Sequence, residues 1–252
     1  MKSFKALLTS ICLLLTFTSC VGCEAKTAKD DGENHSSKAA EKNTSDETTH
    51  ARLLYMGHAS LRITTPEGKV IYVDPYAGTG YEPAADLILI THDHFDHTAT
   101  DRITNRSAGC QTVTWKEALV KGKYGKFDFG FATVEAVEAG YNRNHSVKNC
   151  VGYVITLSDG VSIYVSGDTS KTKQMAKLAE RKLDYAFYCC DGVYNMDLKE
   201  AAECAKLVGA KHDIPYHVIA AKGDKFFDRK RAESFDSPHL LVIDQGEEIE
   251  LA

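Results

Sequence analysis

The sequence lacks several features that would assign it at once to a common class of protein. Its eight cysteines do not have the dense, regular spacing of a small disulfide-stapled domain. The apolar stretch at residues 6–17 is too short for a comfortable transmembrane helix. Neither a Gly-x-Ser-x-Gly nucleophile elbow nor a His-Glu-x-x-His zinc helix occurs. These absences argue against a disulfide scaffold, a serine hydrolase with that elbow and a metalloprotease with that helix.

The chain also lacks an excess of positive charge. It has 30 basic and 35 acidic residues, and removal of residues 1–20 would take away two lysines and no acid, which leaves a formal charge of −7. No basic stripe with interleaved aromatic residues is visible, and such a stripe is the usual footprint of nucleic-acid binding. The sequence therefore predicts a small-molecule substrate and no nucleic-acid partner, and it leaves the oligomeric state open.

The first fifty residues have the composition of an export signal followed by a tether. Residues 1–20 have a basic start and a short apolar core, which predicts a signal peptide. Phe17-Thr18-Ser19-Cys20 resembles a bacterial lipobox, so Cys20 is the expected lipidation site, with Cys23 as a weaker alternative and an ordinary cleaved signal as the other interpretation. Residues 21–50 are expected to be a flexible linker, because residues 24–50 contain no apolar side chain larger than alanine. We therefore expect an exported protein of the cell envelope, anchored to a membrane by lipid and facing the periplasm or the cell surface.

The remaining residues, 51–252, suffice for one domain with a substantial core. Apolar and β-branched runs predict an antiparallel meander at 52–56, 60–65 and 69–74, and a buried strand at 87–91. A hairpin with its turn at Ser158-Asp159-Gly160 joins expected strands at 151–157 and 161–165. Further strands are expected at 131–137, 185–189 and 214–217, with a strand or hairpin within 240–251. Helices are expected at 98–104, 116–121, 171–181 and 198–208, the last capped by Asp197. This order predicts an α/β fold of two packed mixed sheets with helices outside.

The most informative segment is the run from His92 to His97, which holds three imidazoles and two carboxylates in six residues. In an extended chain alternate side chains share a side, so His92, His94 and Asp96 can reach one region. If the chain turns into a helix at Asp96, His97 swings round and can serve a second ion beside the first. The competing interpretation is a histidine-rich surface stretch that binds metal adventitiously.

Further ligand types follow at loop positions downstream. Asp168 comes after an expected strand in Ser166-Gly167-Asp168-Thr169, where the glycine permits a tight turn, and a carboxylate there can bridge two cations. His145 lies in a polar loop, and His217 ends an apolar segment. Each of these residues alone is more often structural or solvated, but together with the run they supply the separate-loop ligands that a pair of metal sites needs.

With these residues in place, the sequence resembles the metallo-β-lactamase fold superfamily over nearly all of residues 51–252. The resemblance rests on Asp74-Pro75, the His-x-His-x-Asp-His run, His145, Gly167-Asp168-Thr169 and His217. Four segments look like the branch of L-ascorbate-6-phosphate lactonases and related metal-dependent hydrolases, with N-acyl-phosphatidylethanolamine phospholipase D more distant: Gly57-His58-Ala59-Ser60, residues 91–97, Tyr141-Asn142 and residues 192–197.

The resemblance implies an αββα sandwich and a set of site residues. By that resemblance the first metal is held by His92, His94 and His145, the second by Asp96, His97 and His217, and Asp168 bridges the two. Asp74 would orient the ligand loop, although a plain turn aspartate is the alternative. His58, Asn142 and Tyr194 are candidates for facing the substrate, with a structural role as the alternative for His58 and Tyr194. Cys189-Cys190 departs from the branch; buried strand is the favoured interpretation, and a nucleophilic or metal-binding thiol is the alternative.

These expectations together describe a hydrolase with two divalent ions, with zinc as the first choice and manganese or iron as alternatives. A water shared by two such ions ionises near neutral pH, so a metal-bound hydroxide can attack a carbonyl or phosphorus. Asp96 and His217 are the predicted catalytic residues; Asp96 can help to orient the nucleophile, although as a metal ligand it is not free to act as a simple base. The predicted substrate is a lactone or other cyclic ester, or a phosphoester. The alternatives are a β-lactamase, and a non-catalytic envelope-tethered protein that only binds metal.

Overall fold

A computed structural model describes residues 50–220 and 225–252 of the chain. The predicted signal peptide, Cys20, Cys23 and all but the last residue of the predicted linker lie outside these residues, so those expectations and the domain boundary at residue 51 stay predictions. Within the two described ranges, no helix is both long and apolar enough to cross a membrane.

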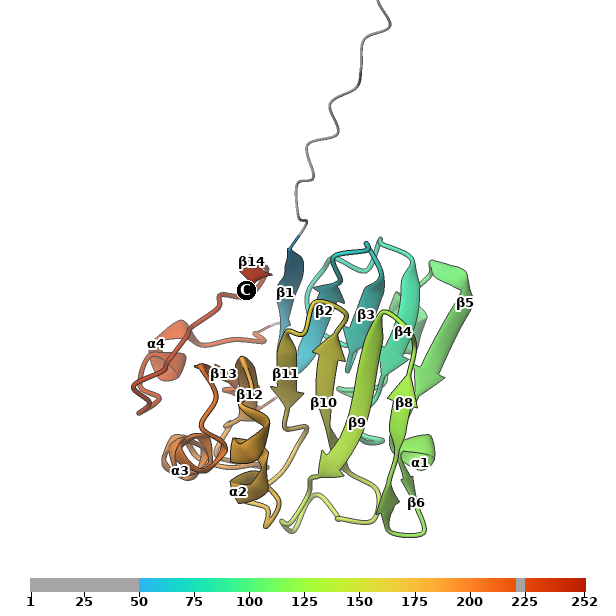
Figure 1. The fold of residues 1–252 in the computed structure, drawn as a ribbon. Helices are drawn as coiled ribbons and strands as arrows, with labels where there is room; N and C mark the ends of the chain where they lie inside the picture. The colour runs from blue at the N-terminus through green and yellow to red at the C-terminus, as the bar shows by residue number, and fades with distance from the viewer. Residues whose placement is uncertain (1–49, 221–224) are drawn as a thin grey trace, which may run out of the picture. The chain divides into compact units, whose positions relative to one another are not determined.

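The first sheet contains six strands in the order β14-β1-β2-β3-β4-β5 (Figure 1). The predicted antiparallel meander is formed by β1 (Ala51–Gly57), β2 (Ser60–Thr64) and β3 (Val70–Val73). Next come β4 (Ala85–Leu89) and β5 (Arg106–Val113), both parallel to β3, while β14 (Glu248–Leu251) pairs with the other edge. Strand β5 was not predicted, because an edge strand with mostly exposed residues has no apolar alternation to reveal it.

The second sheet also contains six strands, in the order β13-β12-β11-β10-β9-β8. Its antiparallel part is β8 (Lys126–Asp128), β9 (Ala132–Glu138), β10 (Val151–Leu157) and β11 (Ser162–Val165). Its parallel part continues from β11 to β12 (Tyr185–Cys189) and β13 (His212–Tyr216). The predicted hairpin between β10 and β11 is confirmed, and its turn contains Gly160 at φ +93°. A small separate ribbon pairs β6 (Leu119–Val120) with β7 (Lys123–Tyr124).

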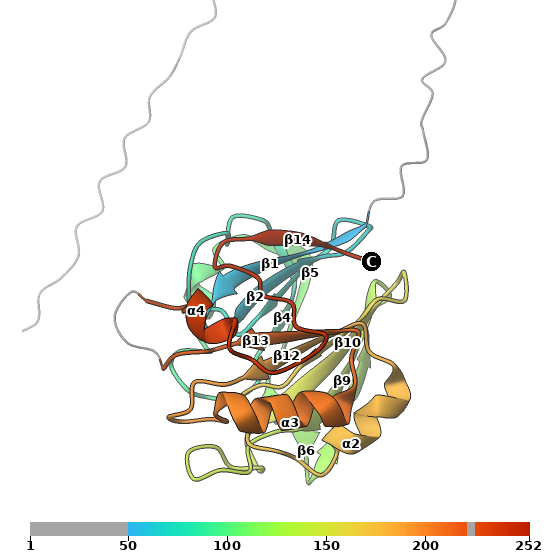
Figure 2. The same cartoon turned by 90° about the vertical axis from the view of Figure 1, so that its left-hand side faces the viewer.

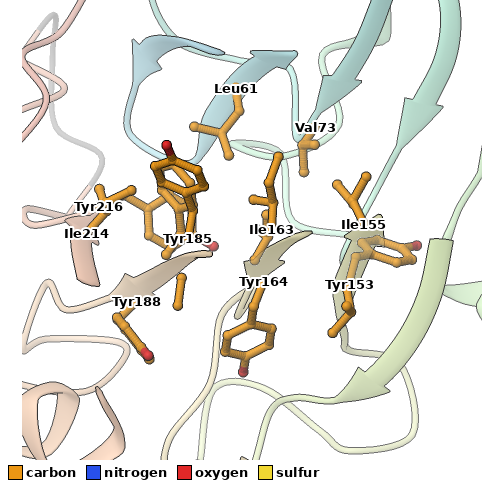
Figure 3. Packing of buried hydrophobic residues seen from close by; sticks show 14 of the residues in the cluster. Leu61, Val73, Tyr153, Ile155, Ile163, Tyr164, Tyr185, Tyr188, Ile214 and Tyr216 are labelled. Atoms are coloured by element: carbon orange, nitrogen blue, oxygen red, sulfur yellow. The ribbon is translucent and has the colours of Figure 1, made fainter. Parts of the chain in front are cut away.

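The main core lies between the two sheets. Alternation along each strand sends every second side chain inward, as for Leu61 of β2 and Val73 of β3. Figure 3 shows these two residues facing Ile163 and Ile155 of the second sheet. All four are fully buried, which matches two sheets packed face to face.

The outer faces of the two sheets are covered differently. Beside the second sheet lie α2 (Met175–Leu178), continued by the 3₁₀ turn η2 (Ala179–Arg181), and α3 (Leu198–Val208) (Figure 2). On the first sheet the outward residues Leu54, Met56 and Tyr72 form a second cluster with Tyr81, from the segment between β3 and β4, and with Ile103, beside the 3₁₀ turn η1 (Thr100–Arg102). The predicted sandwich of two mixed sheets with helices outside is therefore confirmed, although irregular chain supplies much of the cover over the first sheet.

The helix predictions had mixed outcomes. The helix at 198–208 is confirmed as α3: Asp197 accepts a hydrogen bond from the Glu200 N–H (2.8 Å), and Gly209 ends the helix at φ +65°. The expected helix at 171–181 is shorter, and that at 116–121 is replaced by α1 (Trp115–Ala118) followed by β6. A short α4 (Arg229–Ala232) was not predicted.

The helix expected at 98–104 is reduced to a single 3₁₀ turn, and the idea that a helix begins at Asp96 is wrong. Only η1 occurs in that range, and the chain from Phe95 to His97 forms a single turn. The His97 N–H donates to the His94 carbonyl, and the Ala99 N–H then donates to the Pro75 carbonyl. Because the backbone bonds to the loop after β3, it cannot continue a helical ladder.

Candidate metal centre

The predicted ligands come from loops that follow strands of both sheets. Strands β3 and β4 are parallel, as are β11, β12 and β13, so within each sheet their carboxyl ends meet at one edge. The loop after β4 carries the run from His92 to His97, the turn after β11 carries Asp168, and His217 directly follows β13. His145 comes from the long connection between β9 and β10. The sheet packing therefore brings together residues that are far apart in the sequence.

The first group of donor atoms contains His92, His94 and His145. One ring nitrogen from each lies within 4.8 Å of the others, and the ring centroids are 4.6, 5.0 and 4.8 Å apart. The His145 Nε2 and His94 Nδ1 atoms are 3.2 Å apart. These are the three residues that the resemblance implied for the first metal.

The second group contains Asp96, His97 and His217, as the resemblance implied, and also His58. Asp168 lies between the two groups. Its carboxylate oxygens are 3.3 Å from His145 Nε2, 3.5 Å from His217 Nε2 and 3.6 Å from His97 Nε2. A carboxylate within reach of histidines from both groups has the position that a bridging ligand needs.

Several donor atoms at this centre are buried without any hydrogen-bond partner among the described residues. They are His58 Nδ1, His92 Nε2, His97 Nε2, Asp168 Oδ1 and both ring nitrogens of His217. Buried polar atoms are nearly always satisfied, so a concentration of unsatisfied atoms at one point calls for an unseen partner. Imidazole and carboxylate together suit zinc, manganese or iron. The residues present thus fit a divalent-metal centre.

Asp74 contacts the loop that carries the run from His92 to His97 and fixes its conformation. Its Oδ1 accepts the Thr91 N–H (2.8 Å), and its Oδ2 accepts the Thr91 hydroxyl (2.6 Å) and lies 2.9 Å from His97 Nδ1. Because the Thr91 hydroxyl donates to Asp74, its lone pair can accept the proton on Nδ1 of His92, 3.0 Å away. Both imidazoles are then protonated at Nδ1 and turn Nε2 toward the centre, the arrangement that metal-ligating histidines require.

Asn142 orients the imidazole of His145 in the same way. Its Oδ1 accepts the backbone N–H groups of Asn144 and His145 (both 2.9 Å) and lies 3.1 Å from His145 Nδ1. Asn142 is not among the residues that line the cavity beside the centre. Its carbonyl oxygen faces His145, and the expectation that Asn142 contacts the substrate stays a prediction.

Two residues that sequence reasoning missed hold Asp168. The Asn195 amide donates to Asp168 Oδ2 (2.7 Å) and to Asp191 Oδ2 (2.8 Å), and Asp191 Oδ1 accepts the N–H groups of Val193 and Tyr194 (both 2.7 Å). Asp191 is buried and comes just after a strand, as Asp74 and Asp168 do. An aspartate shortly after an apolar strand is a pattern visible in the sequence, and it could have identified Asp191.

Backbone strain accompanies these contacts. Three non-glycine residues at the centre, His58, Asp74 and His217, adopt left-handed φ angles of +53°, +43° and +46°. Such conformations persist only where surrounding contacts hold them, and they concentrate at functional sites. Gly167 is at φ +60°, and a Cβ there would lie 2.6 Å from the Val151 carbonyl oxygen, so this turn before Asp168 requires glycine.

The charges at the centre shift several pKa values. Burial opposes ionisation of Asp168, but the surrounding histidines, His217 and His97 foremost, hold its pKa well below the ordinary range. Burial likewise opposes the charged form of His97, but Asp168 and Asp74 raise its pKa to about 9, so in the metal-free protein Nε2 also carries a proton, which an ion binding there must displace. Burial and then the neighbouring His217 lower the pKa of His58 to about 4. The Asp168 carboxylate is therefore an anion at neutral pH, ready to bind a cation.

A cavity of about 470 Å³ opens over the centre, lined by His94, Phe95, Asp96, Asn144, His145, Asp168, Tyr194 and His217. Phe95 and Tyr194 are 70% and 51% exposed at this cavity, so Tyr194 lies where a substrate-facing residue was expected. His58 is fully buried and does not line the cavity, so the expectation that it faces the substrate does not fit its position. Within residues 50–220 and 225–252, no lysine or arginine belongs to the lining.

Cys189 and Cys190 lie at the end of β12 and are fully buried. Burial raises the pKa of both thiols, so neither is a ready nucleophile. The Cys189 sulfur accepts the Thr169 N–H (3.4 Å) beneath the turn that carries Asp168. The favoured interpretation, buried strand, agrees with this placement.

Comparison with known proteins places this geometry in a family. A family model described as "Beta-lactamase superfamily domain" matches residues 52–217. A UPF0173 metal-dependent hydrolase of Anaeromyxobacter dehalogenans is 29% identical over 199 residues, which cover 65% of this chain and 73% of the relative. A metal-dependent hydrolase of Thermococcus onnurineus is 30% identical over 229 residues, which cover 79% of this chain and 99% of the relative.

Solved structures agree with these matches. A crystal structure described as a metal-dependent hydrolase from Parabacteroides distasonis has a TM-score of 0.61 and 26% identity, covering 75% of this chain and 90% of that one. An isothiocyanate hydrolase from Delia radicum gut bacteria has a TM-score of 0.60 at 18% identity, covering 80% and 99%, which is a likeness of fold alone. The chain therefore belongs to the metallo-β-lactamase superfamily and is a metal-dependent hydrolase.

Proposed function

We propose that this protein is an exported hydrolase with two divalent ions, and that it opens a lactone or another uncharged cyclic ester. The observation that carries the two-ion part is the position of Asp168 between the two groups of donor atoms, whose buried ring nitrogens have no partners among the described residues. A closed structural site would need only four ligands and no second group. Zinc is the first choice of metal, with manganese and iron as alternatives.

Ions bound there would lower the pKa of a water molecule and polarise the group under attack. The chain's own residues supply the positioning. Asp74 and Asn142 turn His97 and His145 inward, and Asn195 holds Asp168. Asp96 and His217 line the cavity, so they are the second-group residues that can meet both the nucleophile and the substrate.

The cavity lining supports an uncharged substrate over a phosphoester. Arginine and lysine, which often bind phosphate groups, do not line the cavity among the described residues, but two divalent ions can themselves bind a phosphate, so the substrate panel below decides between the two substrate classes. The lining instead offers the apolar face of Phe95, the ring of Tyr194 and the amide of Asn144. A lactone with an apolar substituent complements these groups, and it agrees with the lactonase-like motifs of the sequence.

Metal analysis tests the two-ion part of the proposal. The purified wild-type protein should contain close to two ions per chain, and Asp168→Ala should lose at least one. Asp159→Ala is a control: that aspartate lies in the turn before β11, at the opposite end of the strand from Asp168, so the variant should keep both ions. A stoichiometry of zero or one in the wild type would refute the two-ion centre.

A substrate panel tests the reaction. Lactones, phosphodiesters, cephalosporins and isothiocyanates are offered with and without a chelator. Hydrolysis of lactones that the chelator abolishes is the expected result. Preferred cleavage of cephalosporins would favour a β-lactamase, and full metal occupancy with no turnover across the panel would favour a protein that only binds metal.

Export and membrane anchoring rest on the pattern of residues 1–20 and on Cys20. The expected result is that the wild-type protein fractionates with membranes and that Cys20→Ala does not. Recovery of the wild-type protein with its first twenty residues intact in the cytoplasm would refute this part.

A further inference from the structure

His58 contacts two residues of the second donor group at once. Its Nε2 lies 3.0 Å from Asp96 Oδ2, and its ring packs on the ring of His217 with centroids 3.7 Å apart. Its backbone carbonyl accepts hydrogen bonds from the His217 N–H (2.9 Å) and from the Tyr55 hydroxyl (3.0 Å), and its own N–H donates to the Phe226 carbonyl (2.8 Å). The imidazole is fully buried in the connection between β1 and β2.

The spacing of the rings decides whether His58 can share an ion with His217. A metal–nitrogen bond of about 2.1 Å puts the centre of a coordinated imidazole about 3.2 Å from the ion. Two imidazoles at octahedral or tetrahedral angles then have centroids about 4.5 to 5.2 Å apart. The three rings of the first group satisfy this range, at 4.6, 4.8 and 5.0 Å. The His58–His217 separation of 3.7 Å would need an angle of only about 70° at the ion, which is too narrow for two ligands of one ion. The 5.7 Å between His97 and His217 corresponds to about 125°, a wide angle that two ligands of a five-coordinate ion can adopt.

The observations favour His217 over His58 as the ligand of the second ion. Neither of its ring nitrogens has a hydrogen-bond partner among the described residues, its Nε2 lies 3.5 Å from Asp168, and it lines the cavity. His58 also has one buried ring nitrogen without a hydrogen-bond partner among the described residues, Nδ1, but it lines no part of the cavity and its Nε2 is already engaged with Asp96. An imidazole that donates from Nε2 to a carboxylate leaves one oxygen of that carboxylate free to face an ion.

We propose that His58 is a positioning residue for the second metal: its ring N–H holds the Asp96 carboxylate, and its ring face and carbonyl hold His217. This inference rests on the proposed two-ion centre. It assigns no contact with the first group, because the contacts from His58 to the ligands of a proposed ion go to Asp96, His97 and His217, all in the second group.

Three variants separate positioning from direct coordination. His58→Phe keeps the ring that packs on His217 but removes the N–H donor, His58→Gln keeps an N–H donor for Asp96, and His58→Ala removes both. Each full-length protein is stripped of metal and titrated with zinc against a competing chelator, while circular dichroism monitors the fold. This measurement does not depend on knowing the substrate.

The expected result is selective. In His58→Phe and His58→Ala the second zinc binds about 10 to 100 times more weakly while the first is unchanged, which is the usual effect of losing a residue that orients a ligand. His58→Gln recovers much of that loss. Cobalt in the second site of His58→Gln should keep the wild-type absorption spectrum, because the coordinating atoms are unchanged.

Three outcomes would overturn the inference or its basis. Wild-type affinity for both ions in His58→Phe would remove any role for the ring N–H. A cobalt spectrum in His58→Gln that shows one imidazole fewer, with affinity as weak as in His58→Ala, would make His58 a ligand. A wild-type protein that binds a single ion would instead refute the proposed two-ion centre itself, whatever the variants do. If His58→Ala does not fold, the phenylalanine and glutamine variants still decide the question.

Discussion

Asp74→Asn should weaken both the fold and the metal centre, because Asp74 is a fully buried carboxylate that serves both. It accepts the N–H and the hydroxyl of Thr91 and lies in hydrogen-bond contact with His97. Asparagine has nearly the same shape and tolerates the left-handed φ of +43° at this position, so the substitution removes charge without adding backbone strain. The substitution removes one of the two side-chain oxygens that accept hydrogen bonds.

The magnitude follows from counting the donors. Three donor groups converge on two carboxylate oxygens, and an asparagine offers one acceptor oxygen and turns an NH₂ toward the remaining donors. A hydrogen bond to a charged group contributes about 1.5 to 3 kcal/mol, and a buried donor left without an acceptor costs about 1 to 3 kcal/mol. We therefore expect the free energy of unfolding of the metal-free protein to fall by about 3 to 5 kcal/mol.

Urea denaturation of chelator-treated protein measures this loss, and zinc titration measures the accompanying weakening of metal binding, expected to be about 10 to 100-fold. Asp86→Asn in β4 is a matched control. That carboxylate accepts the Val70 N–H (3.0 Å) and pairs with the half-exposed Lys69, so its loss should cost about 1 kcal/mol and leave metal binding unchanged. A metal-free Asp74→Asn protein within about 1 kcal/mol of the wild type would refute the reasoning.

Three further changes have definite expected outcomes. Asn142→Leu removes the acceptor that orients His145, so the first zinc should bind about 10 to 100 times more weakly in a competition titration; equal affinity would deny Asn142 this role. Phe95→Ala should change the free energy of unfolding by less than about 0.5 kcal/mol because the ring is 70% exposed. It should also raise KM for lactones with an apolar substituent by about tenfold, and an equal effect on unsubstituted lactones would contradict the apolar contact. Burial raises the pKa of Asp213, so the folded protein holds that proton to higher pH than the unfolded chain does. The contribution of Asp213 to stability is therefore fully present below its ordinary pKa and declines as pH rises through the raised pKa, so Asp213→Asn should gain stability relative to the wild type as the pH rises above about 4. Urea denaturation at several pH values checks this, and a difference that does not change with pH would refute it.

Local patterns predicted those parts of the fold whose determinants are close together in the sequence. The helix α3 begins at an aspartate cap and ends at a left-handed glycine, and both signals lie within a turn of the helix they delimit. The hairpin between β10 and β11 needs only its turn and two flanking apolar runs. The edge strand β5 and the turn at Asp96 escaped prediction, because their conformations depend on backbone partners supplied by β4 and by the loop after β3.

The metal centre divides in the same way. The sequence by itself determined the types of metal-binding side chain, because a run of alternating histidines and an aspartate after a buried strand is typical of a metal site. The glycine before Asp168 likewise indicated a tight turn. Only the tertiary structure decided what each neighbouring residue does. In the folded protein the ring of His58 packs on His217, and the Asn142 side chain lies in hydrogen-bond contact with His145. Asn195 donates hydrogen bonds to both Asp168 and Asp191 and so links them. The physical reason is that a donor's chemistry belongs to its side chain, whereas the direction in which it points depends on hydrogen bonds between loops that only the packed sheets bring together.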